Sequence, residues 1–148
     1  RNGEPDETEG EPHRHSRERE VVLTDTVGFI RDLPKDLVNA FRATLEELEH
    51  ADILIHVAAA SSPQVAAQIA AVDAILATLD LTATPTVRVL NKADRADPTV
   101  LARLAAELDA IPMSAIDAAT TLPLLAELER RLWGQYDTAP QTEHLAPR

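Results

Sequence analysis

The chain has 148 residues, a formal net charge of -11 and no cysteine. Its length suits one domain, and 45% hydrophobic but only 3% aromatic residues predict a core of aliphatic side chains. An acidic balance argues against direct DNA binding, because phosphate backbones attract basic surfaces. The lack of cysteine excludes disulfides and thiolate metal sites, and no apolar stretch approaches the ~18 residues of a membrane span. We therefore expect a cytoplasmic protein without a membrane span.

Composition divides the chain into three parts. Residues 1–20 are polar and charged without apolar periodicity, which predicts a flexible charged lead-in. His13-Arg14-His15 within them is compatible with metal or anion contact, although a solvated loop is the simpler interpretation. Residues 21–134 alternate apolar runs with helical patterns and form the predicted domain. Residues 135–148 are predicted to be a disordered tail.

The middle part predicts an α/β fold with a mostly parallel sheet. Apolar runs predict four strands, at Val21–Thr24, Ile53–Val57, Thr86–Leu90 and Ile111–Ser114. Apolar residues at helical spacing predict four helices, at Lys35–His50, Ser62–Leu79, Val100–Leu108 and Leu122–Trp133. Strands and helices that alternate at this spacing are typical of a three-layer domain. Trp133 and Tyr136, at the end of the last helix, favour packing of that helix end over contact with a partner.

Short polar motifs stand at the carboxyl ends of three predicted strands. Asp25-Thr26-Val27-Gly28 follows the first strand, and Asn91-Lys92-Ala93-Asp94 follows the third. Ser114-Ala115-Ile116 stands at the end of the fourth. Each motif alone is compatible with ordinary turn chemistry. The three motifs in this order are typical of a guanine-nucleotide site, with GTP or GDP as the ligand.

The last two motifs suit recognition of the guanine base. Guanine presents an N1–H and an exocyclic amine on one edge, and the Asp94 carboxylate suits both protons. Asn91 suits the other polar edge of the purine and the loop itself, while the aliphatic stem of Lys92 suits the flat base. Ser114 and Ala115 would support the loop with hydroxyl and backbone groups.

The first motif suits the phosphates and their metal ion. Asp25, at the end of a strand, suits a water molecule bound to Mg²⁺, and Gly28 allows the backbone to approach a γ-phosphate. The alternative is that Asp25 and Thr26 cap a turn that Gly28 permits. Phe29 stands where many GTPases have a glutamine that orients the attacking water. This residue either makes intrinsic hydrolysis slow or anchors the loop in the core, and both interpretations are open.

The first motif lies in a stretch, Leu23–Val57, that closely resembles the HflX family of translational GTPases, and Asn91–Asp94 and Ser114–Ile116 fall where that family has its base-recognition motifs. The resemblance implies a GTP-binding domain of P-loop type, with Mg²⁺ bound together with GTP. It also implies association with the large ribosomal subunit and a role in splitting stalled ribosomes. It implies no catalytic side chain, because Phe29 fits a family with a hydrophobic residue in place of the catalytic glutamine.

The resemblance also implies which residues bind GTP. They are the third motif at Asp25, Thr26, Val27 and Gly28, the fourth at Asn91, Lys92 and Asp94, and the fifth at Ser114, Ala115 and Ile116. Asp25 would contact the metal through water. Two positions depart from the family. Ala59 stands where an aspartate is usual, and Asp117–Thr121 replaces a segment that usually contains glycines.

No G-x-x-x-x-G-K-[ST] run occurs in the 148 residues. The expectation is therefore an incomplete P-loop GTPase-type domain whose central P-loop strand, first switch and amino-terminal domain are missing. One hypothesis is that the chain is part of an HflX-type GTPase domain, inactive by itself. The alternative is a non-catalytic pseudo-GTPase or interaction fragment that does not bind nucleotide without the P-loop.

Overall fold

The computed structural model describes residues 19–26 and 46–137, with the side chains of 46, 47 and 135–137 left out. The described part contains a three-stranded sheet with the order β1-β2-β3. Both pairings are parallel, so all strands run in one direction. The strands are β1 (Leu54–Ala59), β2 (Thr86–Asn91) and β3 (Ala110–Pro112).

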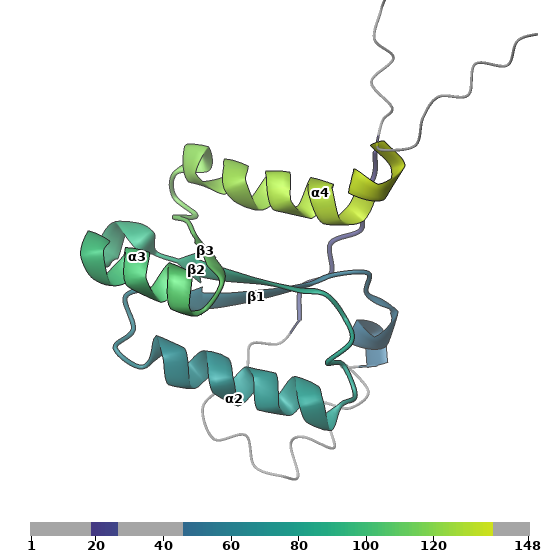
Figure 1. Ribbon diagram of the computed structural model, residues 1–148, viewed down its shortest axis with the longest axis horizontal. Helices are drawn as coiled ribbons and strands as arrows, with labels where there is room; N and C mark the ends of the chain where they lie inside the picture. The colour runs from purple at the N-terminus through teal and green to yellow at the C-terminus, as the bar shows by residue number, and fades with distance from the viewer. Residues whose placement is uncertain (1–18, 27–45, 138–148) are drawn as a thin grey trace, which may run out of the picture.

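Helices cover both faces of this sheet. Figure 1 shows α4 on one side of the strands and α2 on the other, which gives three layers. The α-helices are α2 (Val65–Thr78), α3 (Pro98–Glu107) and α4 (Leu122–Asp137), and short 3-10 helices are η1 (Glu46–His50), η2 (Ala93–Arg95) and η3 (Ala118–Thr121). The predicted α/β class with a parallel sheet is confirmed, and the arrangement is consistent with part of a P-loop GTPase-type domain.

The core is centred on β2, the middle strand. Val87, Val89 and Leu90 are all less than 4% exposed, because strands on both sides and helices on both faces exclude water. Leu90 packs in a cluster with Val65 and Ile69 of α2, and apolar residues of α3 extend the cluster. β2 is therefore the strand around which the core is built.

An ion pair crosses from the middle strand to α2. The Arg88 guanidinium donates to Asp73 Oδ2 at 3.0 Å and to the Leu108 carbonyl, after α3, at 3.3 Å. His56 of β1 stands in register with Arg88, and burial lowers the pKa of this imidazole below its usual value. Arg88 thus links the middle strand to α2 and to the C-terminal end of α3 by charge-assisted hydrogen bonds.

Local sequence signals explain where α3 begins. Asp97 caps the helix, and its Oδ1 accepts from the amides of Thr99 at 2.9 Å and Val100 at 3.0 Å. Pro98 occupies the first helical position, where its missing N–H leaves no hydrogen bond unmade. Asp97 and Pro98 together therefore place the start of α3 two residues before the predicted Val100.

Several predicted boundaries move by a few residues. Thr86–Leu90 is a strand as predicted, whereas the strand predicted at Ile53 begins at Leu54 and continues to Ala59. The helix predicted from Ser62 begins at Val65, because the preceding residues form a turn in which Val65 N–H donates to the Ser62 carbonyl at 3.2 Å. β3 ends at Pro112, before Ser114, and α4 extends beyond Trp133.

The strand predicted at Val21–Thr24 is wrong. These residues are described, yet they belong to no strand, and Val22 and Leu23 are 96% and 81% exposed. A strand needs a neighbour to accept and donate its backbone hydrogen bonds. Within the described residues β1 pairs with β2 alone, so Val21–Thr24 is paired with no described strand.

Other predictions fall mostly outside the described residues. Of the helix predicted at Lys35–His50, only Glu46–His50 is described, and it forms η1. The predictions of a flexible lead-in and a disordered tail concern residues that lie almost entirely outside the described ranges. No helix in the described part is long and apolar enough to span a membrane.

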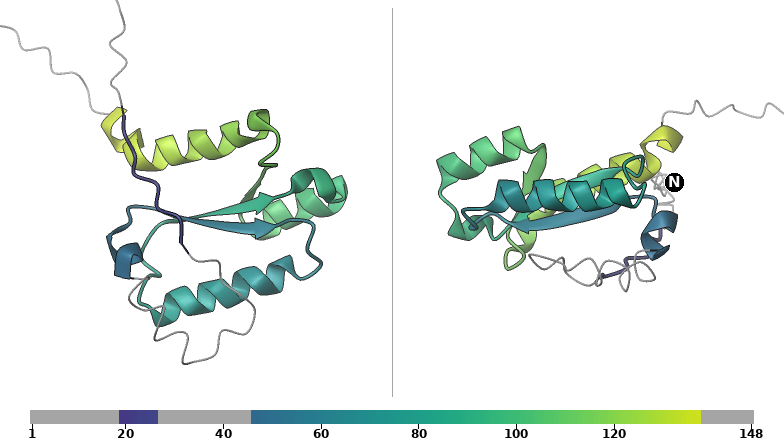
Figure 2. Two further views of the ribbon diagram at one scale, coloured as in Figure 1. Left: turned by 180° about the vertical axis from the view of Figure 1, so that it is seen from behind. Right: turned by 90° about the horizontal axis from the view of Figure 1, so that it is seen from below.

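Trp133 packs within the chain, as the sequence favours. Figure 2 shows the described segment 19–26 beginning beside the C-terminal end of α4 in both views. There the Arg19 guanidinium lies 5.2 Å from the centre of the Trp133 ring, and Arg19 Nη1 lies 3.2 Å from Glu129 Oε1. The side chain of Tyr136 lies outside the described residues.

Leu90 is fully buried, so Leu90→Ala should leave a cavity in the core. We expect the free energy of unfolding to fall by about 2–5 kcal/mol, measured by urea denaturation. The matched control is Leu125→Ala, because Leu125 is 56% exposed. A cost for Leu90→Ala no larger than that of the control would contradict the described core.

Glu127 should make stability depend on pH. Hydrogen bonds from Arg130 and then Arg131 lower the pKa of Glu127 from 4.5 to about 2. The ionised carboxylate therefore stabilises the fold above about pH 4.5, and this contribution is lost as the pH falls toward about 2. We expect Glu127→Gln to cost roughly 0.5–1 kcal/mol at pH 7, with the difference from the unaltered chain shrinking over that window.

The measurement is denaturant unfolding at a series of pH values. Glu107→Gln is the control, since its carboxylate pairs with Arg103 of the same helix and is 53% exposed. A difference for Glu127→Gln that stays constant from pH 7 to pH 2 would show that the lowered pKa contributes nothing.

Candidate functional site

The parallel strands bring the Asn91–Asp94 motif and the Ser114–Ile116 motif to one edge of the sheet. Asn91 is the last residue of β2, and Ser114 follows β3 by two residues. Beyond the strands, the backbones stay paired, with Met113 N–H donating to Leu90 O and Ala93 N–H donating to Met113 O, both at 3.0 Å. Motifs 20 residues apart in sequence are thus in direct contact. We call Asn91–Asp94 together with Ser114–Ala115 the motif edge.

The Asn91 side chain fastens the two loops of the motif edge together. Its Oδ1 accepts from the amide of Lys92 at 2.8 Å and from the amide of Ala115 at 3.0 Å. One acceptor therefore satisfies two loop amides that belong to different motifs. The predicted role of Asn91 in holding the loop is matched by these contacts.

Lys92 sits at a sharp turn of the backbone. Its φ of 61° and ψ of 36° lie in the left-handed region, which side-chain-bearing residues seldom adopt. The turn directs the chain from β2 into η2, which carries Asp94. Lys92 itself is exposed, so its stem is available to a flat ligand at this edge.

The Asp94 carboxylate is oriented by Ser114. Ser114 Oγ donates to Asp94 Oδ1 at 2.6 Å, and Ser114 is 3% exposed whereas Asp94 is exposed. A carboxylate oxygen has two lone pairs, so Oδ1 can accept another hydrogen bond, and among the described residues Oδ2 has no donor. The result is an exposed pair of acceptors held in one orientation by a buried hydroxyl.

Residues after Ser114 complete the loop, and the sequence analysis did not assign them a role. Thr120 Oγ1 lies 2.9 Å from both the amide nitrogen and the carbonyl oxygen of Ser114. Asp117 Oδ1 accepts from the Ala119 amide at 3.1 Å and so begins η3. The signal was present in the sequence, because Asp and Thr are residues that bond to nearby backbone and fold tight loops.

The first motif is not brought to the motif edge. Asp25 is exposed and Thr26 is half-buried, and no described hydrogen bond joins either to Asn91, Asp94 or Ser114. Val27, Gly28 and Phe29 lie outside the described residues. Ile116 follows the motif edge with its apolar side chain 87% exposed.

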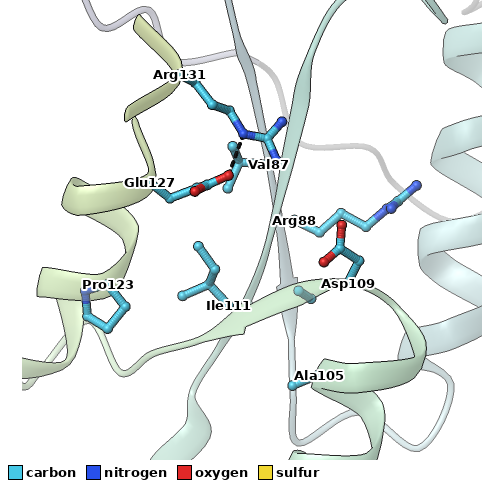
Figure 3. A pocket seen from close by; sticks show the side chains of 9 residues that line it. Val87, Arg88, Ala105, Asp109, Ile111, Pro123, Glu127 and Arg131 are labelled. Atoms are coloured by element: carbon cyan, nitrogen blue, oxygen red, sulfur yellow. Dashed lines mark hydrogen bonds and ion pairs between the residues drawn. The ribbon is translucent and has the colours of Figure 1, made fainter. Parts of the chain in front are cut away.

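A pocket of about 330 Å³ lies elsewhere, between β2, β3, α3 and α4 (Figure 3). Glu127 and Arg131, one turn apart on α4, point toward each other at one side of it, with Arg131 Nε 2.6 Å from Glu127 Oε1. Arg131 also donates to the Thr86 carbonyl at 3.3 Å. Because these charged groups already satisfy one another, the pocket offers a ligand less than the exposed acceptors of the motif edge do. None of its lining residues belongs to the predicted site.

Known proteins provide an independent comparison. Over 111 residues the chain is 44% identical to GTPase HflX of Magnetococcus marinus, a match covering 74% of this chain and 26% of that protein. It is 53% identical over 76 residues to GTPase HflX of Caldanaerobacter subterraneus, covering 51% of this chain and 18% of that protein. A third relative, GTPase HflX of Escherichia coli, is 51% identical over 75 residues, 51% of this chain and 18% of that protein.

The chain belongs to the HflX family. It thereby belongs to a family of GTP-binding GTPases, as the resemblance of Leu23–Val57 implies. The matched segments span about a quarter or less of the length of these relatives. No protein-family model matches the chain.

Side chains that could bind a metal ion do not cluster in the part of the chain that the structure describes. No three His, Cys, Asp or Glu side chains come together there in a group that could hold a metal ion. The single predicted metal contact is Asp25, through water, and its carboxylate is exposed. Mg²⁺ commonly binds through one or two carboxylates, water and substrate phosphates, so a lone aspartate fits a metal that arrives with a nucleotide.

The Asn91 contacts predict a measurable loss of stability. Asn91→Ala should leave the amides of Lys92 and Ala115 without their protein acceptor. Because both hydrogen bonds are exposed and water can replace that acceptor, we expect a cost of roughly 0.5–1.5 kcal/mol in the free energy of unfolding. Asn91→Asp keeps an acceptor oxygen and should recover part of that loss. Urea denaturation of both variants provides the measurement, and equal stability of Asn91→Ala and the unaltered chain would contradict the contacts.

Proposed function

We propose that the motif edge binds the base of GTP and GDP, and that this chain carries the guanine-reading part of an HflX-type GTPase site. The observation that supports the proposal is the 2.6 Å hydrogen bond from Ser114 Oγ to Asp94 Oδ1. It presents an exposed carboxylate in a fixed orientation beside a loop that Asn91 and Lys92 complete.

The Asp94 carboxylate suits guanine and rejects adenine. The N1–H and exocyclic amine of guanine donate two parallel hydrogen bonds, and a carboxylate accepts both. Adenine offers no N1–H, so one acceptor would face its N1 lone pair. Because an unsatisfied polar pairing costs more than a good hydrogen bond contributes, the preference should be large.

Other predicted site residues have complementary roles. Asn91 Nδ2 would donate to the acceptor edge of the purine while Oδ1 holds the two loops. The stem of Lys92 would cover one face of the base. Ala115 and Ile116 would contribute from the same loop as Ser114, the residue that orients Asp94. The 148 residues contain no G-x-x-x-x-G-K-[ST] run, and the contacts proposed for the motif edge concern the base alone.

Asp25, Thr26, Val27 and Gly28 are proposed to act at the phosphate end. Asp25 would hold water on Mg²⁺ bound with the nucleotide, and Gly28 would donate its amide to the γ-phosphate. GTP hydrolysis and association with the large ribosomal subunit are proposed from family membership, which the identity to GTPase HflX proteins supports. A cytoplasmic location follows from the same proposal.

The test is a titration of this chain with fluorescent GDP and Mg²⁺. We expect saturable binding that Asp94→Asn weakens by about tenfold or more, because a carboxylate accepting two protons is replaced by an amide. Xanthosine diphosphate supplies the control. Xanthine has a carbonyl in place of the guanine amine, so the amide that Asp94→Asn introduces should pair with it, and the variant should prefer the xanthine nucleotide.

Two results would overturn the proposal. One is no saturable GDP binding by a chain shown to be folded, which would favour the alternative of a non-catalytic interaction fragment. The other is GDP binding that Asp94→Asn leaves unchanged, which would place the nucleotide away from the motif edge.

A further inference from the structure

The Thr120 side chain forms hydrogen bonds with the backbone of Ser114, the residue that orients Asp94. The Thr120 hydroxyl accepts from the Ser114 amide at 2.9 Å. Its Oγ1 also lies within hydrogen-bond distance of two carbonyl oxygens to which it can donate, Ser114 O at 2.9 Å and Asp117 O at 2.7 Å. Both backbone polar groups of Ser114 thus meet one side chain six residues away. Asp117 N–H also donates to the Ser114 carbonyl at 2.9 Å, which closes the loop between them.

Ser114, which these hydrogen bonds hold, is itself buried. Ser114 is the one polar or charged residue that is buried in the described part of the chain, at 3% exposure. Its hydroxyl is committed to Asp94, so the position of the serine backbone determines where the Asp94 carboxylate points. Thr120 therefore stands two hydrogen bonds away from the exposed acceptor pair.

We propose that Thr120 is a positioning residue that sets guanine specificity through Ser114 and Asp94. The inference rests on the proposed function of the motif edge. Thr120 lies within Asp117–Thr121, after the last recognised motif, and its hydroxyl ties this segment to the backbone of Ser114. Selectivity for guanine in this chain thus depends on a side chain outside the recognised motifs.

The chain supplies a matched control one residue away. Thr121 lies in the same 3-10 helix, and its hydroxyl donates at 2.7 Å to Ala118 O, without contact to Ser114. Thr120→Val and Thr121→Val each remove one hydroxyl and keep the β-branched shape. Thr120→Ser restores the hydroxyl at the first position.

The experiment compares GDP with inosine diphosphate, which lacks the exocyclic amine and so gives Asp94 one hydrogen bond instead of two. A displaced carboxylate weakens the two-bond pairing more than the one-bond pairing. We expect Thr120→Val to reduce the ratio of GDP to inosine diphosphate affinity by about threefold to tenfold. Thr121→Val should leave the ratio unchanged, and Thr120→Ser should restore most of it.

Amide hydrogen exchange provides a second measurement without nucleotide. The Ser114 amide should exchange faster in Thr120→Val than in the unaltered chain or in Thr121→Val. A general loss of stability would instead lower both nucleotide affinities by the same factor, and that result would overturn the positioning role. An unchanged affinity ratio in Thr120→Val would overturn it as well.

The unaltered chain separates the two proposals. If it binds GDP and Thr120→Val keeps its selectivity, the inference fails and the proposed function stands. If the unaltered chain binds neither nucleotide, the proposed function fails and the inference fails with it.

Discussion

Parallel pairing of β2 with both neighbours is the constraint on which the rest of the structure depends. Parallel strands end at the same edge of a sheet, so residues after β2 and β3 meet although 20 residues separate them in sequence. The same pairing buries Leu90 completely and leaves the adjacent Asn91 at the surface. The burial that stabilises the domain therefore also carries the polar motifs to the edge where a ligand can reach them.

At that edge the loops are held by side chains rather than by regular structure. Asn91 satisfies amides of both motifs, and Ser114 turns the Asp94 carboxylate outward. Thr120 in turn grips Ser114 from both sides of its backbone. Hydrogen bonds are directional, so each of these contacts helps to orient the next residue in the series. An acceptor oriented before the ligand arrives loses less entropy on binding, which favours selectivity.

Sequence analysis succeeded where the signal was local and the burial was complete. The run Thr86–Leu90 predicted β2, and its apolar residues Val87, Val89 and Leu90 are the most deeply buried of the strand. It failed at Val21–Thr24, an equally apolar run that forms no strand. Composition shows that a segment can pair, but a strand forms only where a neighbouring strand accepts and donates hydrogen bonds. None of the described strands pairs with Val21–Thr24. The family resemblance found the motifs but not Thr120, because that residue lies outside them and meets Ser114 only through the folded loop.

The sequence by itself determined the α/β class, the family and the positions of the short polar motifs, because these follow from apolar period and from short runs of characteristic residues. Tertiary structure decided which of them come together. It joined Asp94 to Ser114 and Asn91 to Ala115, and it left Asp25 without a described contact to them. The physical reason is that hydrogen bonds between distant residues require a shared edge and a fixed register, which only the packed sheet supplies.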